Sequence, residues 1–186
     1  MIRTFIAIKI DSILEKDFWQ LQQELKKKLT AGRPKWVEPQ NMHLTINFLG
    51  EIKEELIPLI EASLQTGLKE IKPFILSFCG LGVFPNLRKP RVLWSGINEG
   101  KDSVSKIYNF TQESLSSIGF SQTNKCYHPH LTLARFRESV PFADISSVVK
   151  ETSFSSSMIT VKGITLFQSI LRRQGSQYIP LKEILF

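Results

Sequence analysis

Two of the three histidines in this chain open the same tripeptide, His-Leu-Thr. His43 opens the first copy and His130 opens the second, and a threonine follows two positions later, Thr45 or Thr132. Histidine titrates near neutral pH, so one imidazole can act as a base while its mate acts as an acid. A threonine hydroxyl can hydrogen-bond a charged oxygen. These groups suit displacement at phosphorus, in which the attacking oxygen loses a proton and the leaving oxygen gains one, by a scheme that requires no metal.

The first copy predicts a strand with one reactive face, because residues two apart on a β-strand point the same way. His43 and Thr45 share that face, and Asn47 follows them. On the opposite face we expect an aliphatic and aromatic row, Leu44-x-Ile46-x-Phe48, to enter the core.

The second copy repeats this arrangement. His128, His130 and Thr132 share one face, opposite Leu131 and Leu133. The two copies lie almost half a chain length apart, which predicts two similar α+β lobes related by an approximate two-fold axis. If the lobes face each other, both imidazoles and both hydroxyls converge on one cleft.

Strand and helix patterns surround each copy in a similar order. Alternating or apolar runs predict strands over 3–10, 42–49, 74–79, 91–97, 130–136, 158–171 and 178–186. Helical spacing of apolar residues predicts helices over 12–29, 54–68, 102–118 and 142–150, with Asp11 or Ser12 capping the first. The Gly- and Pro-rich stretch "GLGVFPNLRKP" reads as a connection, and no linker divides the chain, so we expect one bilobal domain over 1–186.

Composition narrows the class of protein. Hydrophobic residues make up 42% of the chain, enough for a core, but no apolar run is long enough to cross a membrane. Cys79 and Cys126 form no CxxC motif, so we expect free thiols in a reducing compartment, the cytoplasm. Because the cleft is formed within one chain, we expect a monomer.

The net charge of +7 favours anionic partners. The basic residues gather in four groups, at 26–28, at 88–91, at Arg135 with Arg137, and at Arg172 with Arg173. The lysine triplet has the composition of a helix C-terminus, where cations are favourable. The other groups lie beside strands or turns and are candidates for binding an anion.

The motif residues and their flanks resemble the 2H phosphoesterases, a family named for two His-x-Thr/Ser-x motifs. The resemblance rests on "RTFIAIKI", "KWVEPQNMHLTINFLGE", "GLGVFPNLRKPRVLW", "YHPHLTLAR" and "YIPL", in that order along nearly the whole chain. The most similar branch is the bacterial and archaeal RNA 2′,3′-cyclic phosphodiesterases, also described as 2′–5′ RNA ligases. The resemblance implies a bilobal α+β fold with antiparallel sheets lining a central groove. It also implies opening of a terminal 2′,3′-cyclic phosphate on RNA to a 2′-phosphate without a cofactor or metal, with ligation as the reverse reaction.

Residue roles follow from the same resemblance. His43 would protonate the departing 3′ oxygen, and His130 would activate water, although the motif order does not decide which histidine is the acid. Thr45 and Thr132 would hold the phosphate oxygens. Arg135 matches the basic residue that ends the second motif. Strict alternation places it on the leucine side of its strand, so it needs a β-bulge or a strand end to reach the cleft.

His128 leaves the sequence open to other interpretations. It can contribute to RNA binding at the mouth of the groove. His128-x-His130 is also a metal-ligand spacing, and with His43 as third ligand the chain would be a zinc-dependent hydrolase. A third alternative is a non-catalytic RNA-binding module, with stacking surfaces at Trp36, Trp94 or Phe84.

Overall fold

The protein is described by a computed structural model over residues 1–122, 126–172 and 175–186. Its main feature is a curved antiparallel eight-stranded sheet with the order β10-β9-β1-β3-β7-β6-β5, in which β2 also pairs with β7. The first half of the sheet contains β1 (Ile2–Lys9), β3 (His43–Ile52), β9 (Gly163–Arg172) and β10 (Gly175–Leu185). The second half contains β2 (Pro34–Trp36), β5 (Phe78–Phe84), β6 (Val92–Ile97) and β7 (Leu131–Phe136). A separate two-stranded sheet pairs β4 (Phe74–Leu76) with β8 (Ile159–Val161).

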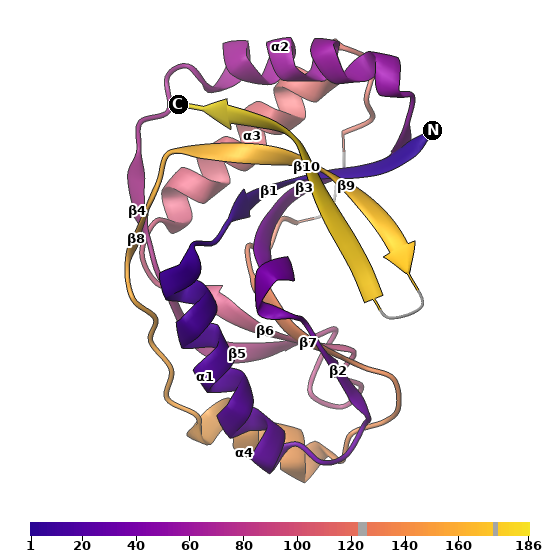
Figure 1. Ribbon diagram of the computed structural model, residues 1–186. Coiled ribbons are helices and arrows are strands. Elements are labelled where there is room, and N and C mark those ends of the chain that lie inside the picture. Colours follow the sequence, from indigo (N-terminus) through magenta and orange to yellow (C-terminus); the bar gives the residue numbers. More distant parts are fainter. Residues whose placement is uncertain (123–125, 173–174) are drawn as a thin grey trace.

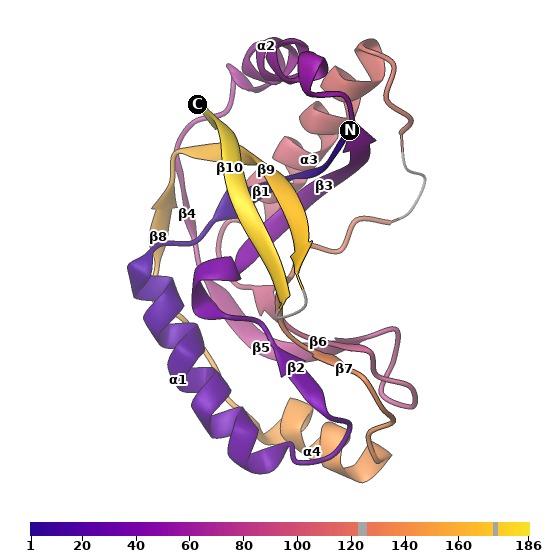
Figure 2. The ribbon, with the colours of Figure 1, turned by 45° about the vertical axis from the view of Figure 1, so that its right-hand side comes forward.

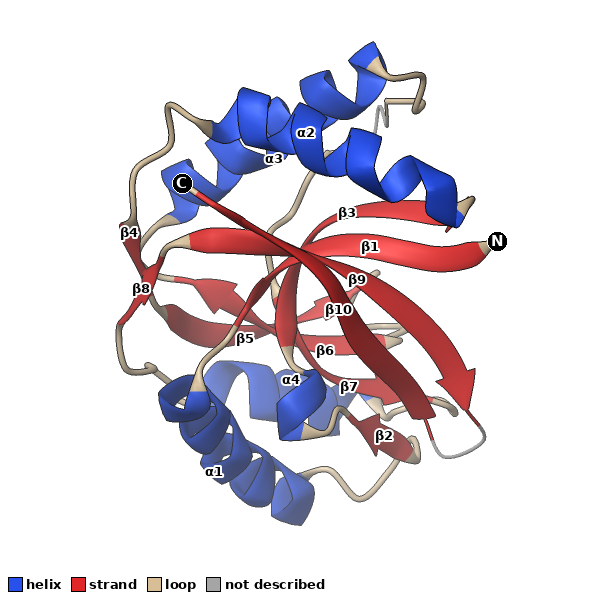
Figure 3. Ribbon diagram, turned by 45° about the horizontal axis from the view of Figure 1, so that its top comes forward, coloured by secondary structure: helices blue, strands red, loops and turns tan. Residues whose placement is uncertain are grey.

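Helices cover the two halves from opposite ends of the molecule (Figures 1 and 3). The helical segments are α1 (Ser12–Lys28), α2 (Ile57–Leu68), α3 (Lys101–Ser117) and α4 (Phe142–Glu151), with short 3₁₀ turns η1 (Pro39–Asn41) and η2 (Glu54–Leu56). The pair α2 and α3 packs on the first half, where α3 contacts β3 and α2 contacts β10. The pair α1 and α4 lies against the second half, as Figure 2 also shows. The chain therefore crosses between halves, since β1 belongs to the first half and α1 to the second.

The predicted bilobal α+β fold is confirmed, with one refinement. The two antiparallel sheets that we expected are one sheet, because β3 and β7 pair at a single position, Leu44 opposite Leu131. These are the middle residues of the two His-Leu-Thr tripeptides. The join between the halves thus lies within the two motifs.

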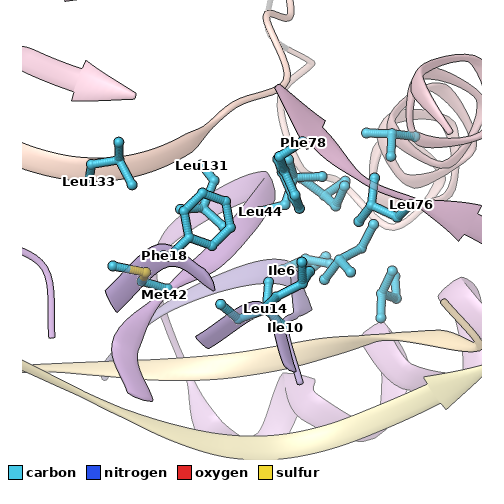
Figure 4. Close-up of a cluster of buried hydrophobic side chains, with 14 of the residues drawn as sticks. Ile6, Ile10, Leu14, Phe18, Met42, Leu44, Leu76, Phe78, Leu131 and Leu133 are labelled. Atoms are coloured by element: carbon cyan, nitrogen blue, oxygen red, sulfur yellow. The ribbon is translucent and has the colours of Figure 1, made fainter. Parts of the chain in front are cut away.

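A continuous core lies on the leucine side of both motif strands (Figure 4). Leu44, Leu131 and Leu133 are fully buried there, together with Phe18 of α1 and Phe78 of β5. Burial of apolar area stabilises the fold by about 25 cal/mol per Å², so packing holds both motif strands firmly. The opposite faces of the strands remain for the polar motif residues.

Most predicted elements are confirmed, including the Asp11 cap, whose carboxylate accepts hydrogen bonds from the amides of Ile13 and Leu14. The "GLGVFPNLRKP" stretch was wrong in part, because its residues up to Phe84 form β5. Two features make a glycine-rich strand possible here. A bulge follows Cys79, and the indole of Trp94 occupies the space above Gly82 that a side chain would need.

Both cysteines are free thiols, as predicted. In the part of the chain that the structure describes, no helix combines the length and apolar character that a membrane crossing requires.

Candidate active site

His43 lies at the start of β3 in an aromatic setting. Its ring centroid is 4.8 Å from that of Phe5 and 5.0 Å from that of Tyr178, which it meets edge-on. Its Nδ1 lies 2.7 Å from the carbonyl oxygen of Asn41, two residues earlier. The Asn41 side chain in turn donates to the carbonyl of Ser176 in β10. The hairpin β9–β10 thus helps to fix the loop that orients His43.

His130 has the same backbone arrangement in the second half. Its Nδ1 lies 2.7 Å from the carbonyl oxygen of His128, again two residues earlier. The ring meets Phe84 edge-on at 4.8 Å and lies 6.1 Å from Trp94. The two motif histidines are thus held in equivalent ways by unrelated neighbours.

These hydrogen bonds determine which nitrogen is reactive. A carbonyl oxygen can only accept, so Nδ1 carries the proton in His43 and in His130. In the neutral imidazole the other nitrogen, Nε2, then has a free lone pair. Both histidines therefore present Nε2 as the atom that accepts or donates a proton.

The surroundings hold both imidazoles neutral in the free protein. Burial lowers the pKa of His43 from 6.5 to about 4, against the hydrogen bond to Asn41, and the charges of Arg135 and His130 lower it further. Burial also lowers the pKa of His130, against its hydrogen bond to His128, and the charges of His128 and Arg135 act in the same direction. The charge of Arg135 thus lowers both pKa values, and the charge of His130 lowers that of His43.

A cavity of about 310 Å³ opens between the halves beside these groups. His43 and Thr45 line it from β3, and Thr132 and Arg135 line it from β7. The His43 imidazole, both motif hydroxyls and a guanidinium therefore converge on one space, whereas His130, which we also expected there, is not among the lining residues. A small anion such as a phosphate could be bound there by charge-assisted hydrogen bonds.

Arg135 reaches the cavity through the β-bulge that the alternation rule required. In the pairing with β6, Leu93 lies opposite Ala134 and Trp94 lies opposite Thr132, so Leu133 is the extra residue of β7. Leu133 and Ala134 are consequently both buried, and the side chain after them turns to the cleft.

A second bulge at the same position of the other motif makes one prediction wrong. In the pairing of β3 with β1, Ala7 lies opposite Thr45 and Ile6 lies opposite Asn47, so Ile46 is the extra residue. We expected Phe48 on the core face, but it is 66% exposed and lines the cavity. In each motif strand the bulge residue follows the threonine, and the residue five positions after the histidine, Phe48 or Arg135, enters the cleft.

Other cavity residues were not identified from the sequence. Arg3 and Phe5 come from β1, and Ser169, Ser176 and Tyr178 come from the β9–β10 hairpin. Arg3, Phe5 and Tyr178 lie in two of the stretches that carry the family resemblance, but their local pattern does not assign them to the cleft. Only the pairing of strands that are distant in sequence brings them beside the two histidines.

His128 does not join the two motif histidines in a metal site. It is exposed and packs against Trp94 at 5.0 Å and edge-on against Phe84 at 5.4 Å. Among the described residues, no group of three or more His, Cys, Asp or Glu side chains could hold a metal ion. The zinc alternative built on His43, His128 and His130 therefore lacks its ligand set. Phe84 and Trp94, which we considered as stacking surfaces for RNA, instead pack against the rings of His128 and His130.

Tyr127 links the two halves beside the site. Its hydroxyl donates to the carbonyl oxygen of Thr45 at 2.8 Å, immediately before the bulge in β3. Its ring stacks on Tyr108 of α3, with centroids 4.0 Å apart. Burial raises the pKa of this phenol, which therefore stays protonated and donates.

Tyr127→Phe should lower the free energy of unfolding by about 1 kcal/mol, because it leaves a carbonyl oxygen without its hydrogen bond. Tyr108→Phe is the matched control, since that hydroxyl has no hydrogen bond among the described residues and the ring stack is retained. Chemical denaturation of both variants measures the difference. Equal stability of the two variants would show that the bond to Thr45 contributes nothing.

Comparison with known proteins shows the family to which this chain is related. The family model described as LigT like Phosphoesterase matches residues 8–94 and 96–178. An RNA 2′,3′-cyclic phosphodiesterase of Archaeoglobus fulgidus is 37% identical over 182 residues, which are 97% of this chain and 98% of that protein. An RNA 2′,3′-cyclic phosphodiesterase of Aquifex aeolicus is 32% identical over 186 residues, and the match covers 98% of this chain and 96% of that protein.

Solved structures show the same architecture. Escherichia coli LigT in complex with 3′-AMP superposes with a TM-score of 0.76 at 25% identity, covering 99% of this chain and 97% of that one. TT0787 of Thermus thermophilus superposes with a TM-score of 0.81 at 23% identity, covering 98% and 97%. The second match supports the fold alone.

Proposed function

Since the chain belongs to the LigT-like phosphoesterases of the 2H phosphoesterase superfamily, as its motifs predicted, we propose that it is an RNA 2′,3′-cyclic phosphodiesterase. The substrate is RNA that ends in a 2′,3′-cyclic phosphate, and the product ends in a 2′-phosphate. The relatives named above carry this activity in their names, and the E. coli protein was crystallised with a nucleotide.

The observation that carries this proposal is the matched presentation of two imidazoles. Each motif histidine holds its Nδ1–H on the carbonyl two residues before it, at 2.7 Å in both cases. Each therefore has Nε2 available for proton transfer, and His43 lines a cavity together with two hydroxyls and a guanidinium. Opposed acid and base groups of this kind contribute about 10²–10⁴-fold each to a rate.

In the proposed reaction, water attacks phosphorus and the bond from phosphorus to the 3′ oxygen breaks. Nε2 of His130 accepts a proton from the water, and the protonated Nε2 of His43 donates one to the departing 3′ oxygen. The hydroxyls of Thr45 and Thr132 and the guanidinium of Arg135 hold the non-bridging oxygens, where negative charge develops. The same steps, with a ribose 5′-hydroxyl in place of water, would form a 2′–5′ linkage, and their reverse would cleave one.

The test is turnover of a short RNA that ends in a 2′,3′-cyclic phosphate, with the product isomer identified by its chromatographic mobility. We expect the 2′-phosphate. Formation of the 3′-phosphate would mean that the other ester bond is broken and would overturn the role proposed for His43.

Hydrolysis should be unaffected by excess EDTA, because the proposed acid, base and phosphate-binding groups are all side chains of this chain. Initial rates with EDTA and with added zinc measure this. Activity that EDTA abolishes and zinc restores would overturn the mechanism and require a metal site elsewhere.

A non-catalytic RNA-binding module remains the second candidate, and the turnover assay separates the two. The exposed ring of Phe48 beside the cavity offers a surface on which a base can stack in either case. Binding of RNA without turnover would favour the module.

A further inference from the structure

A second and larger hollow adjoins the proposed phosphate cavity. Its volume is about 680 Å³, and it lies between the β2–η1 segment and the β9–β10 hairpin. In Figures 1 and 2 this hairpin extends from the first half of the sheet toward β2 and β7. The two hollows share Val37, Asn41, Arg135, Ser176 and Tyr178, so they form one continuous groove.

Three cationic side chains line the larger hollow: Lys35 of β2, Arg135 of β7 and Arg172 of β9. Lys35 reaches across the hollow, since its Nζ lies 3.6 Å from the point where a Cβ on Gly175 would be. The Nε of Arg172 donates to the side chain of Gln177 at 3.2 Å, which fixes the guanidinium beside the opening.

These cations have no carboxylate partner within the described residues. The ion pairs found there use Lys28, Arg33, Lys53 and Lys182 instead. Glu38 is the one acidic residue that lines the hollow, and it forms none of these pairs. Positive charge therefore exceeds negative charge in a concave, solvated site, which favours a polyanion.

From these observations we infer that the larger hollow binds the RNA strand immediately 5′ of the terminal nucleotide, through its phosphates. The inference rests on the proposed function and extends it, because it makes an oligonucleotide a better substrate than a nucleoside 2′,3′-cyclic phosphate. Size assigns the two parts of the groove. The cavity of about 310 Å³ beside His43 takes the cyclic phosphate, and the adjoining hollow of about 680 Å³ has the room for the nucleotides before it. The hollow also has the size of sites that hold a nucleotide-sized ligand.

The experiment compares kcat/KM for a trinucleotide and for a mononucleotide, both ending in the same nucleoside 2′,3′-cyclic phosphate. We expect the wild type to prefer the trinucleotide. Lys35→Ala and Arg172→Ala should each reduce that preference by about 3- to 10-fold, as expected for loss of a solvent-accessible charge-assisted contact. For the double variant, the slope of log kcat/KM against log salt should flatten by about 0.7 per lost phosphate contact.

The matched control is Arg88→Ala/Lys89→Ala. It removes the same charge from a separate cavity that these residues line with Arg91 and Val140. The control should keep the preference for the trinucleotide. An equal loss in the control variant, or a wild type with no preference, would overturn the inference while leaving the proposed activity intact. Failure of the wild type to hydrolyse either substrate would instead refute the proposed function.

Discussion

His43→Ala and His130→Ala should each lower kcat by about 10²-fold or more, because each removes one of the two proton transfers at phosphorus. The double variant should lose much less than the product of the two single losses, since acid and base serve the same displacement. His128→Ala should cost far less and act mainly on KM, because that exposed ring packs against Phe84 and Trp94. Steady-state kinetics with the cyclic-phosphate RNA measures all four variants.

Folding must be separated from catalysis in this series. His43 packs between Phe5 and Tyr178, so alanine leaves a gap there that lowers stability. His43→Gln fills more of the space and should be as inactive as the alanine variant, while its thermal midpoint at neutral pH should lie nearer that of the wild type. A folded His43→Ala with full activity, or a His128→Ala as damaging as His130→Ala, would contradict the two-histidine mechanism.

The sequence predicted which side chains the two motifs present on one face because that arrangement is local. A tripeptide that occurs twice, on strands with regular alternation, places imidazole and hydroxyl on one face and leucine on the other. The structure confirms this for His43, Thr45 and Thr132, which face the cleft, and for Leu44 and Leu131, which are fully buried.

Alternation was insufficient beyond the threonines. Each motif strand contains an extra residue directly after its threonine, Ile46 or Leu133, that shifts the faces of the residues after it. We expected a bulge before Arg135 only because the family resemblance places a basic residue in the cleft. The same reasoning was not applied to Phe48. A bulge depends on the partner strand as much as on the bulged one, so the pattern of a single strand cannot locate it.

The larger hollow was beyond sequence reasoning for a related reason. Lys35 and Arg172 are far apart in the chain, and they meet because β2 pairs with β7 while the β9–β10 hairpin extends over the same edge. In the sequence Arg172 belonged to a basic pair whose other member, Arg173, lies outside the described residues. The lysine triplet at 26–28, by contrast, lies in the last turn of α1, as its local pattern predicted.

The pH dependence of the reaction should differ between free enzyme and enzyme–substrate complex. The active form has one imidazole protonated and the other neutral, so rate against pH should be bell-shaped, with limbs that belong to the coupled pair. Because burial lowers both pKa values, that of His43 to about 4, the optimum of kcat/KM should lie below the ordinary histidine value of 6.5. The optimum of kcat should lie at higher pH, because a bound phosphate anion favours the charged imidazole. The proposed role of His43 as acid depends on this increase of its pKa when the substrate is bound.

Stability supplies an independent measurement of the same pKa. The unfolded chain has an ordinary histidine pKa of 6.5, whereas folding lowers that of His43 to about 4. Between these pH values the unfolded state binds a proton that the folded state does not, so the free energy of unfolding should fall as the pH falls through this window. The loss from His43 alone is roughly 3 kcal/mol, at 1.36 kcal/mol per pKa unit. Urea denaturation from about pH 7 to about pH 4 should show this decline in the wild type and a shallower one in His43→Gln. Parallel declines in the wild type and in His43→Gln would mean that folding does not lower the pKa of His43. In the kinetic experiment, equal pH optima for kcat and kcat/KM would mean that bound substrate does not raise the pKa values of the two histidines.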